Sequence, residues 1–278
     1  MALPTMDLRG RLMHNAIMTA PHPTPVPVPA ATLVVFRRAA DGSPPELLMV
    51  ERSAGMRFAA GAAVFPGGRI DPADHELAEL AVSNHLPRDE AAARIAAIRE
   101  TLEEAGLMVG VSEPVTAGAA AQARAALLTD GRLGPVLAQF GWTLDLDQLV
   151  PFARWCPNHH RAFDTRFYLA DLGAGVVETL VDGTENSRIF WSSARDTLTA
   201  AGRGELHIIF PTRRNLERLA LHDDFAAAAA QARAHPVSTI TPYGEERNGE
   251  PWWVIPEGQG YPVTGEPLAT ALHGLKRT

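Results

Sequence analysis

The chain has 278 residues, of which 46% are hydrophobic and 21% are charged, and its formal net charge at pH 7 is −7. This composition is typical of a globular protein with one large domain and a buried core, and the acidic balance argues against a general nucleic-acid binder. No apolar run is long enough to span a bilayer, and residues 1–20 hold no continuous apolar segment of the signal-peptide type. The single cysteine, Cys156, excludes an internal disulfide and a cysteine-cluster metal site. We therefore expect a cytoplasmic protein that has neither a membrane nor a nucleic acid as a partner.

The N-terminal part of the chain predicts a flexible lead followed by a β-hairpin. Residues 1–29 close with proline at every second position, which favours an extended, poorly packed segment. Residues 31–37 are rich in β-branched and apolar side chains and predict a strand, and residues 47–52 predict the returning strand. A loop over 53–61 and a short apolar stretch then lead into a Pro-Gly-Gly turn, which can bring bare backbone close to another group.

An insertion and a long helix come next. Residues 71–90 contain two prolines around a helix-like piece at 74–82. The long helix opens at 88–90, where Asp89 or Glu90 suits capping and the helix dipole. Gly106 is expected to end it, since glycine readily adopts a positive φ just past a helix. Its apolar face is formed by residues that recur at helical spacing, namely Ala91, Ile95, Ile98 and Leu102.

The C-terminal end of this helix carries three carboxylates on one face. Glu100, Glu103 and Glu104 fall at positions i, i+3 and i+4, and Arg99 lies four residues before Glu103, where it can orient that carboxylate. Like charges at this spacing repel, so the helix gains no stability from them. A solvated acidic surface is one interpretation. The other is a divalent-cation site, because Mg²⁺ binds carboxylate oxygens together with substrate phosphates.

The remaining elements are weaker predictions. Helices are expected over 117–128 and 136–140, and strands over 152–155 and 166–172. An apolar run at 189–191 precedes a helix that starts at Ser192, and residues 212–234 predict one further helix. The last forty residues are rich in proline, glycine and tryptophan and are expected to pack back on the body as a tail.

Gly68 and the run 99–107 resemble the Nudix box, G-x5-E-x7-R-E-U-x-E-E-x-G-U, where U is apolar. The second half matches at every arginine, glutamate and glycine position, and Thr101 replaces the first apolar residue. Arg99 follows Gly68 by 31 positions, 17 more than the 14 of the pattern.

The glutamate in the first half of the box has no match when it is counted back from the arginine. That count falls on Ala91, and Glu90 is one residue, or about 100° of helix rotation, away from it. Asp74 and Asp89 fit no better. We therefore assign no residue to the role of this glutamate, whereas the three carboxylates of the second half of the box are present.

A second resemblance is to the coenzyme A-directed branch of the Nudix enzymes, which carries L-L-T-x-R-[SA]-x3-R-x3-G-x3-F-P-G-G. The matching stretch runs from Leu48 to Gly68, and only Met49 and Val50 differ from it. The interrupted box, and less specifically the stretches 163–167 and 212–216, also resemble the peroxisomal coenzyme A diphosphatase subgroup of animals.

These resemblances imply an α/β Nudix fold, a mixed sheet sandwiched between α-helices, over residues 30–235, with 1–29 as lead and 236–278 as tail. They imply Mg²⁺- or Mn²⁺-dependent cleavage of a diphosphate linkage in a small nucleotide-type substrate. Coenzyme A or acyl-coenzyme A, giving adenosine 3′,5′-bisphosphate and (acyl-)4′-phosphopantetheine, is the expected case.

The family also implies roles for particular residues. The cation would be held by Glu100, Glu103, Glu104 and the Gly68 carbonyl, and catalysis would involve Glu100, Glu103, Arg99 and one more carboxylate from a loop, for which Glu185 is the candidate. The substrate would be bound by Arg52, Arg57, Phe65 and Gly67, because guanidinium groups suit phosphate oxygens.

Two other functions stay open. One is the same chemistry on another nucleoside diphosphate derivative, such as a dinucleotide or a nucleotide sugar. The other is a Nudix-like ligand sensor without catalysis, against which the intact set of three glutamates argues. The adjacent His159 and His160 favour a loop role over metal binding, and Trp252 and Trp253 favour anchoring of the tail. The sequence leaves the oligomeric state undecided, with a homodimer among the options.

Overall fold

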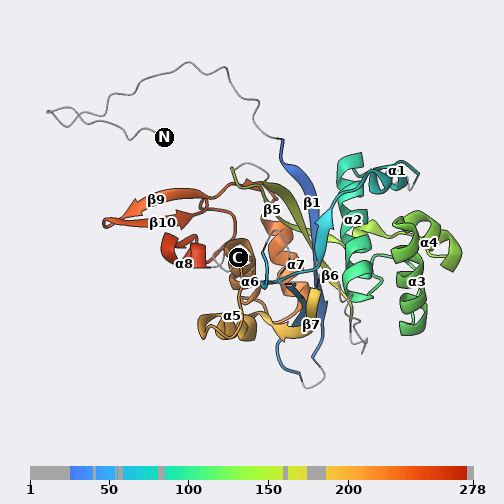
Figure 1. Cartoon of the computed structure of the whole chain (residues 1–278), viewed down its shortest axis with the longest axis horizontal. Helices are drawn as coiled ribbons and strands as arrows, with labels where there is room; N and C mark the ends of the chain where they lie inside the picture. The colour runs from blue at the N-terminus through green and yellow to red at the C-terminus, as the bar shows by residue number, and fades with distance from the viewer. Residues whose placement is uncertain are drawn as a thin grey trace, which may run out of the picture.

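The computed structural model describes residues 26–39, 42–53, 55, 59–80, 85–158, 162–173 and 186–273 of the chain. A mixed sheet lies at the centre with helices on both of its faces, as expected (Figure 1). Its elements are β1 (Val28–Arg37), β2 (Glu46–Arg52), β3 (Ala63–Val64), β4 (Gly67–Arg69), α1 (Pro72–Leu80), α2 (Arg88–Ala105), α3 (Ala117–Asp130), α4 (Leu133–Phe140), η1 (Leu146–Gln148), β5 (Val150–Trp155), β6 (Phe163–Asp171), β7 (Asn186–Ser193), α5 (Ala194–Gly202), α6 (Phe210–Leu219), α7 (Phe225–Ala234), β8 (Thr239–Ile240), β9 (Tyr243–Arg247), β10 (Glu250–Val254), β11 (Gly265–Pro267) and α8 (Leu268–His273).

The strand β1 is the middle of the sheet. The order is β3-β2-β1-β6-β5-β8, and in addition β4 pairs with β1 and β7 pairs with β2. The β1–β2 pair is antiparallel, which confirms the predicted hairpin, whereas β1 and β6 run parallel. A central strand that is covered on both faces reads as a nearly continuous apolar run, and this is why residues 31–37 gave a clear signal.

Each face of the sheet has its own core. On one face Leu33 and Val35 pack with Ile95 and Ile98 of α2, together with residues of α3 and α4. On the other face Val34 lies in a cluster that includes side chains of α6 and α7. The chain therefore forms a three-layer sandwich, with α1 to α4 on one side of the sheet and α5 to α7 on the other (Figure 1).

The helix α2 is built largely as its sequence predicts. The apolar residues of its expected face are all buried, and Gly106 ends it with φ 70° and a backbone N–H that donates to the carbonyl of Leu102. The expected capping by Asp89 or Glu90 is wrong, because Pro87 is the N-cap and no side chain caps it. Both acids instead lie in the first turn, where the helix dipole favours them.

The segment 212–234 is two helices, so the prediction of one is wrong. The first helix, α6, ends at Leu219, and α7 begins after Asp224, whose side chain accepts a hydrogen bond from the N–H of Ala227. Leu221 is exposed in the turn between them. The helix expected from Ser192 begins two residues later than predicted, at Ala194, because Ser193 caps it and accepts from the N–H of Asp196.

The C-terminal region forms more structure than the sequence indicates. The short strand β8 joins the main sheet beside β5, and β9, β10 and β11 form a separate three-stranded sheet that extends from the body (Figure 1). Glu266 on β11 contacts Arg214 on α6 at 3.0 Å, and Tyr261 contacts the indole N–H of Trp155 at 3.2 Å. The division of the chain into lead, domain and tail stays a prediction.

In the described part of the chain, no helix combines the length and the apolar character needed to cross a membrane. The cytoplasmic location expected from the sequence stays a prediction.

Candidate active site

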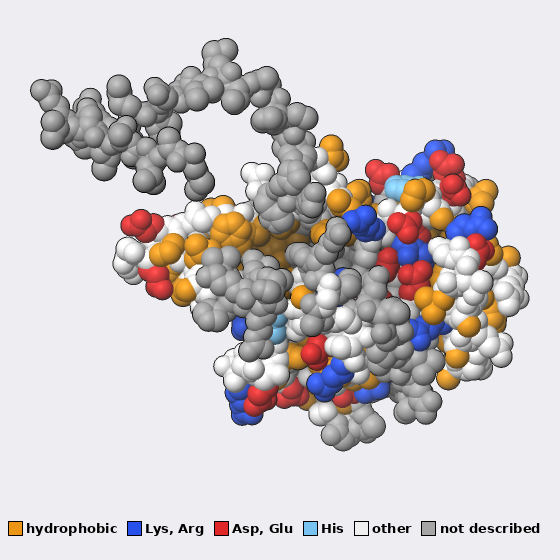
Figure 2. Space-filling view, in the orientation of Figure 1, with side chains coloured by type: hydrophobic (Ala, Val, Ile, Leu, Met, Phe, Trp, Pro, Cys, Tyr) orange, Lys and Arg blue, Asp and Glu red, His pale blue; other side chains and the backbone are white. Residues whose placement is uncertain are grey.

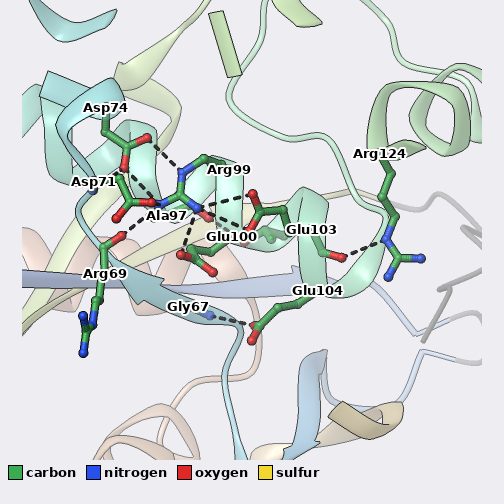
Figure 3. Close-up of polar contacts among 11 residues, drawn as sticks. Gly67, Arg69, Asp71, Asp74, Ala97, Arg99, Glu100, Glu103, Glu104 and Arg124 are labelled. Carbon is green, nitrogen blue, oxygen red and sulfur yellow. Dashed lines mark hydrogen bonds and ion pairs between the residues drawn. The ribbon is translucent and has the colours of Figure 1, made fainter. Parts of the chain in front are cut away.

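The three glutamates of α2 lie where bare backbone passes close to the helix. All three project from its last turns beside β4 (Figure 3), and the backbone N–H of Gly67 donates to Oε2 of Glu104 at 2.9 Å. A Cβ atom on Gly68 would lie only 2.3 Å from Oε1 of Glu100, and one on Gly67 would lie 2.5 Å from the backbone of β1. Gly67 therefore requires glycine, as the Pro-Gly-Gly turn suggested, whereas a side chain at Gly68 would displace the Glu100 carboxylate.

Arg99 is the centre of the polar network. Its guanidinium is only 3% exposed, and Nη1 lies 3.0 Å from Oε1 of Glu100 and 3.3 Å from Oε2 of Glu103. Nη2 also donates to the backbone carbonyl of Arg69 at 2.8 Å, which ties α2 to β4. The structure thus places Arg99 beside Glu103, as the i, i+4 spacing indicated, and adds Glu100 to the same contact.

Asp74, which fits the box no better than Glu90 when it is counted back from Arg99, contacts Arg99 in the structure. Its side chain is 1% exposed, and its two oxygens accept from Nε and Nη2 of Arg99, each at 3.0 Å. Asp74 stands six positions after Gly68, which is the spacing of the first glutamate in the box when it is counted forward from the glycine. The whole 17-residue excess therefore lies between Asp74 and Arg99, and α1 packs against α2 so that the two side chains meet (Figure 3). Asp74 could therefore have been identified from the sequence by counting forward from Gly68.

Burial and like charge shift the titration of this cluster. Burial raises the pKa of Glu100 to about 8, the Arg99 charge opposes this, and the nearby charges of Glu104 and Glu103 add to it. The pKa of Glu103 is also raised, mainly by burial and against the effect of Arg99. Burial lowers the pKa of Arg99, but its hydrogen bond to Asp74 and the surrounding carboxylates raise the pKa by more, so that the net shift is upward. The guanidinium therefore stays charged.

A second arginine supports the end of α2. Arg124 on α3 is buried, and its Nε donates to the backbone carbonyl of Glu103 at 2.8 Å (Figure 3). The last carbonyls of a helix have no partner within the helix, and cations near a C-terminus are favourable. Arg124 thus fixes the turn that carries the three glutamates, and no local pattern in the sequence pointed to it.

A cavity of about 760 Å³ opens in front of this cluster. The glutamates and Arg99 line one end of it, and Arg52 and Arg69 also face it. Its other walls are mostly apolar, and they include Val64, Phe65, Trp155, Phe163, Phe167, Ile209 and Pro211. In Figure 2 hydrophobic side chains lie in a hollow beside a group of red and blue ones. The cavity therefore has one strongly charged end and one apolar end.

The structure places most, but not all, of the predicted site residues. Arg52, Phe65, Gly67 and Gly68 line the cavity together with the α2 carboxylates. Arg57 and Glu185 lie outside the described residues, as do His159 and His160. Trp253 packs on the core of the α6–α7 side, in agreement with the anchoring interpretation, whereas Trp252 contacts Arg247 within the C-terminal sheet.

The donor set suits a hard divalent cation. Among the described residues, no group of three or more histidine, cysteine, aspartate or glutamate side chains is arranged around a common point, because Glu100 and Glu103 face Arg99 while Glu104 faces Gly67. The three side chains nevertheless offer only carboxylate oxygens, which Mg²⁺ and Mn²⁺ prefer. Burial, with a smaller contribution from the charges of Glu104 and Glu103, raises the pKa of Glu100, and a bound cation would favour the charged form of these carboxylates.

Comparison with known proteins finds relatives among solved structures. No protein-family model matches the chain, and no curated protein does. The crystal structure of a NUDIX hydrolase from Alicyclobacillus acidocaldarius is 32% identical, covers 74% of this chain and 96% of its own, and has a TM-score of 0.63. The NUDIX domain of Shewanella oneidensis NrtR complexed with ADP ribose is 13% identical, covers 69% of this chain and 85% of its own, and has a TM-score of 0.39. A C. elegans Ap4A hydrolase binary complex is 18% identical, covers 64% of this chain and 88% of its own, and has a TM-score of 0.35.

Proposed function

The chain belongs to the Nudix hydrolase family, and from this premise we propose that it hydrolyses a diphosphate linkage with the help of a divalent cation. The proposed substrate is coenzyme A or acyl-coenzyme A, and the products are adenosine 3′,5′-bisphosphate and (acyl-)4′-phosphopantetheine. One observation carries the proposal: the carboxylate face of α2 lines the same cavity as Arg52 of the Leu48–Gly68 stretch. Its volume of about 760 Å³ suits a nucleotide-sized ligand.

Each residue of the cluster has a role in this proposal. Glu100, Glu103, Glu104 and the Gly68 carbonyl would hold the cation. Bound there, Mg²⁺ or Mn²⁺ would polarise the phosphoryl oxygens and lower the pKa of a water molecule. Asp74 holds Arg99 by two hydrogen bonds, and Arg99 in turn fixes the first two carboxylates.

The choice of substrate rests on fewer residues than the choice of reaction. Arg52 stands at the end of β2, where its N–H donates to the carbonyl of Ala62 and its own carbonyl accepts from the N–H of Gly61. Arg52 and Gly55 of the coenzyme A-type stretch both line the cavity. A guanidinium group at that point is suited to phosphate oxygens.

Product analysis with coenzyme A and Mg²⁺ or Mn²⁺ tests the proposal. We expect the wild type to release adenosine 3′,5′-bisphosphate and Glu103→Gln, which keeps the size and removes the charge, to release at least about 100-fold less. Glu205→Gln is the matched control, because Glu205 is exposed and does not line the cavity. It should retain wild-type activity.

Two results would count against the proposed substrate or reaction. If the wild type leaves coenzyme A intact and cleaves a dinucleotide or a nucleotide sugar, the reaction stands and the substrate is wrong. If no diphosphate compound is cleaved with either metal while ligands bind tightly, the chain is a ligand sensor and the proposed reaction is refuted.

A further inference from the structure

A second arginine of the cavity, Arg69, has no role in the carboxylate network. It follows Gly67 and Gly68 on β4, and its backbone carbonyl accepts from Arg99 at 2.8 Å. Its side chain points away from Arg99 and from the glutamates (Figure 3). The backbone of this residue is therefore fixed to the catalytic helix, whereas its guanidinium is directed to another part of the cavity.

The guanidinium of Arg69 is exposed and carries a charge that no ion pair offsets in the described part of the chain. At this end of the cavity, Arg99 and not Arg69 forms ion pairs with Asp71, Asp74, Glu100 and Glu103. An exposed arginine in a cavity is available to an anionic ligand, and its planar fork matches the oxygens of a phosphate.

The neighbours of Arg69 mark the direction in which a substrate would extend. Arg69 is paired with Ala30 on β1, which in turn is paired with Thr165 on β6. Its Cζ atom lies 5.9 Å from the centroid of the Phe163 ring, within the range of a cation–π contact. Phe163, Thr165 and Phe167 all line the cavity on the strand β6. Arg69 thus stands between the carboxylate end and the aromatic wall.

We propose that Arg69 is a substrate-binding residue that recognises a second phosphate, separated along the substrate from the diphosphate that is cleaved. The carboxylate end and its cation take the diphosphate, and the Arg69 side chain points away from that end. A phosphate bound by Arg69 must therefore belong to a different part of the molecule. The ligand class is a nucleotide with two separated phosphate groups, and in coenzyme A the second one is the 3′-phosphate. This inference rests on the proposed function for the identity of the diphosphate.

Binding to the full-length protein measures this role without turnover. The probes are adenosine 3′,5′-bisphosphate and adenosine 5′-monophosphate, titrated by calorimetry at one ionic strength. Hydrogen bonds to charged groups contribute enough for a change of about 10- to 100-fold in affinity. We expect the wild type to prefer the bisphosphate by at least about 10-fold, and we expect Arg69→Gln to lose this preference while its affinity for the monophosphate is unchanged.

Two variants serve as controls. Arg69→Lys keeps the charge but not the fork and should retain part of the preference. Arg203→Gln removes an arginine that is 69% exposed, lies 4.0 Å from its partner Glu205 and does not line the cavity, so it should behave as the wild type. The backbone contact of residue 69 with Arg99 does not depend on the side chain, and the melting temperature of each variant checks folding.

Several results would overturn the proposal. These are a wild type that binds both probes equally or binds neither, an Arg69→Gln variant that keeps the preference, and an equal loss of affinity for both probes. Hydrolysis of coenzyme A distinguishes this inference from the proposed function. A wild type that leaves coenzyme A intact, with a preference that Arg69→Gln abolishes, refutes the substrate alone. Cleavage of coenzyme A with an unchanged preference in Arg69→Gln refutes the role of Arg69 alone.

Discussion

Asp74→Asn tests whether Asp74 is the acid that holds Arg99 in place. The substitution keeps the shape of the side chain and one carbonyl acceptor, and it removes the charge that faces Nε and Nη2 of Arg99 at 3.0 Å. Both side chains are almost fully buried, so solvent cannot replace the lost interaction. Removing one partner of a buried ion pair costs about 3–5 kcal/mol. Arg99 retains Glu100 and Glu103, so we expect a smaller loss than this, about 2–3 kcal/mol in the free energy of unfolding.

The assay is urea unfolding combined with thermal melting of the cation-free protein. A loss of this size corresponds to a drop of about 5–10 °C in melting temperature for a chain of this length. Turnover should fall at least about 10-fold, because a misplacement of about 1 Å in a catalytic group is costly and Arg99 orients two carboxylates.

Asp71→Asn is the matched control for stability. Asp71 precedes the same helix and lies 3.6 Å from Nη2 of Arg99, but its side chain is 51% exposed. An exposed ion pair contributes at most about 1 kcal/mol. If Asp74→Asn costs no more than Asp71→Asn, then the buried pair does not hold Arg99, and the assignment of Asp74 to the box is wrong.

The remaining predictions concern the glycine contact and the titration of the cluster. Gly68→Ala should reduce turnover at least about 100-fold, since its Cβ would lie 2.3 Å from Oε1 of Glu100, whereas Gly202→Ala, which meets no atom within 4 Å, should leave activity unchanged. Wild-type activity in Gly68→Ala would refute the close approach. In the cation-free protein, the raised pKa of Glu100 means that the folded state holds a proton that the unfolded state releases above about pH 4.5. The free energy of unfolding should therefore fall as the pH rises from about 4.5 to about 8. Urea unfolding at pH 5 and pH 8 with a chelator should show a smaller difference for Glu100→Gln than for the wild type, and equal differences would contradict the shift.

Where local signals dominate, the sequence was enough to predict the fold. The buried strand β1 is a nearly continuous apolar run, and the apolar residues of α2 recur at helical spacing. Neither pattern depends on distant residues. The break between α6 and α7 was missed because the apolar period continues through it, whereas the cap at Asp224 acts on the backbone. The sheet of β9, β10 and β11 was missed because its strands are short and mostly exposed, so that no alternation of buried and exposed residues marks them.

In the candidate site, too, contacts within one helix could be predicted, whereas contacts that depend on tertiary packing could not. The helical half of the box could be predicted because Arg99, Glu100 and Glu103 are neighbours on one helix, and their contacts follow from its geometry. Arg124 could not be predicted, since its hydrogen bond to the carbonyl of Glu103 depends on how α3 packs on α2. Asp74 could have been found, but a count back from Arg99 assumes that the spacing along the chain is conserved.

The structure explains why that spacing was free to change. Of the described residues between Asp74 and Arg99, 75–80 complete α1 and 88–98 begin α2, and the two helices pack against each other. Lengthening a connection raises its closure cost only with the logarithm of its length, and burial of Ala78 and Leu77 against the core offsets that cost. The distance between Asp74 and Arg99 in space is fixed by two hydrogen bonds, whereas their distance along the chain is constrained by nothing in the site. An acid of this kind is therefore located by counting from Gly68, on its own side of the insertion.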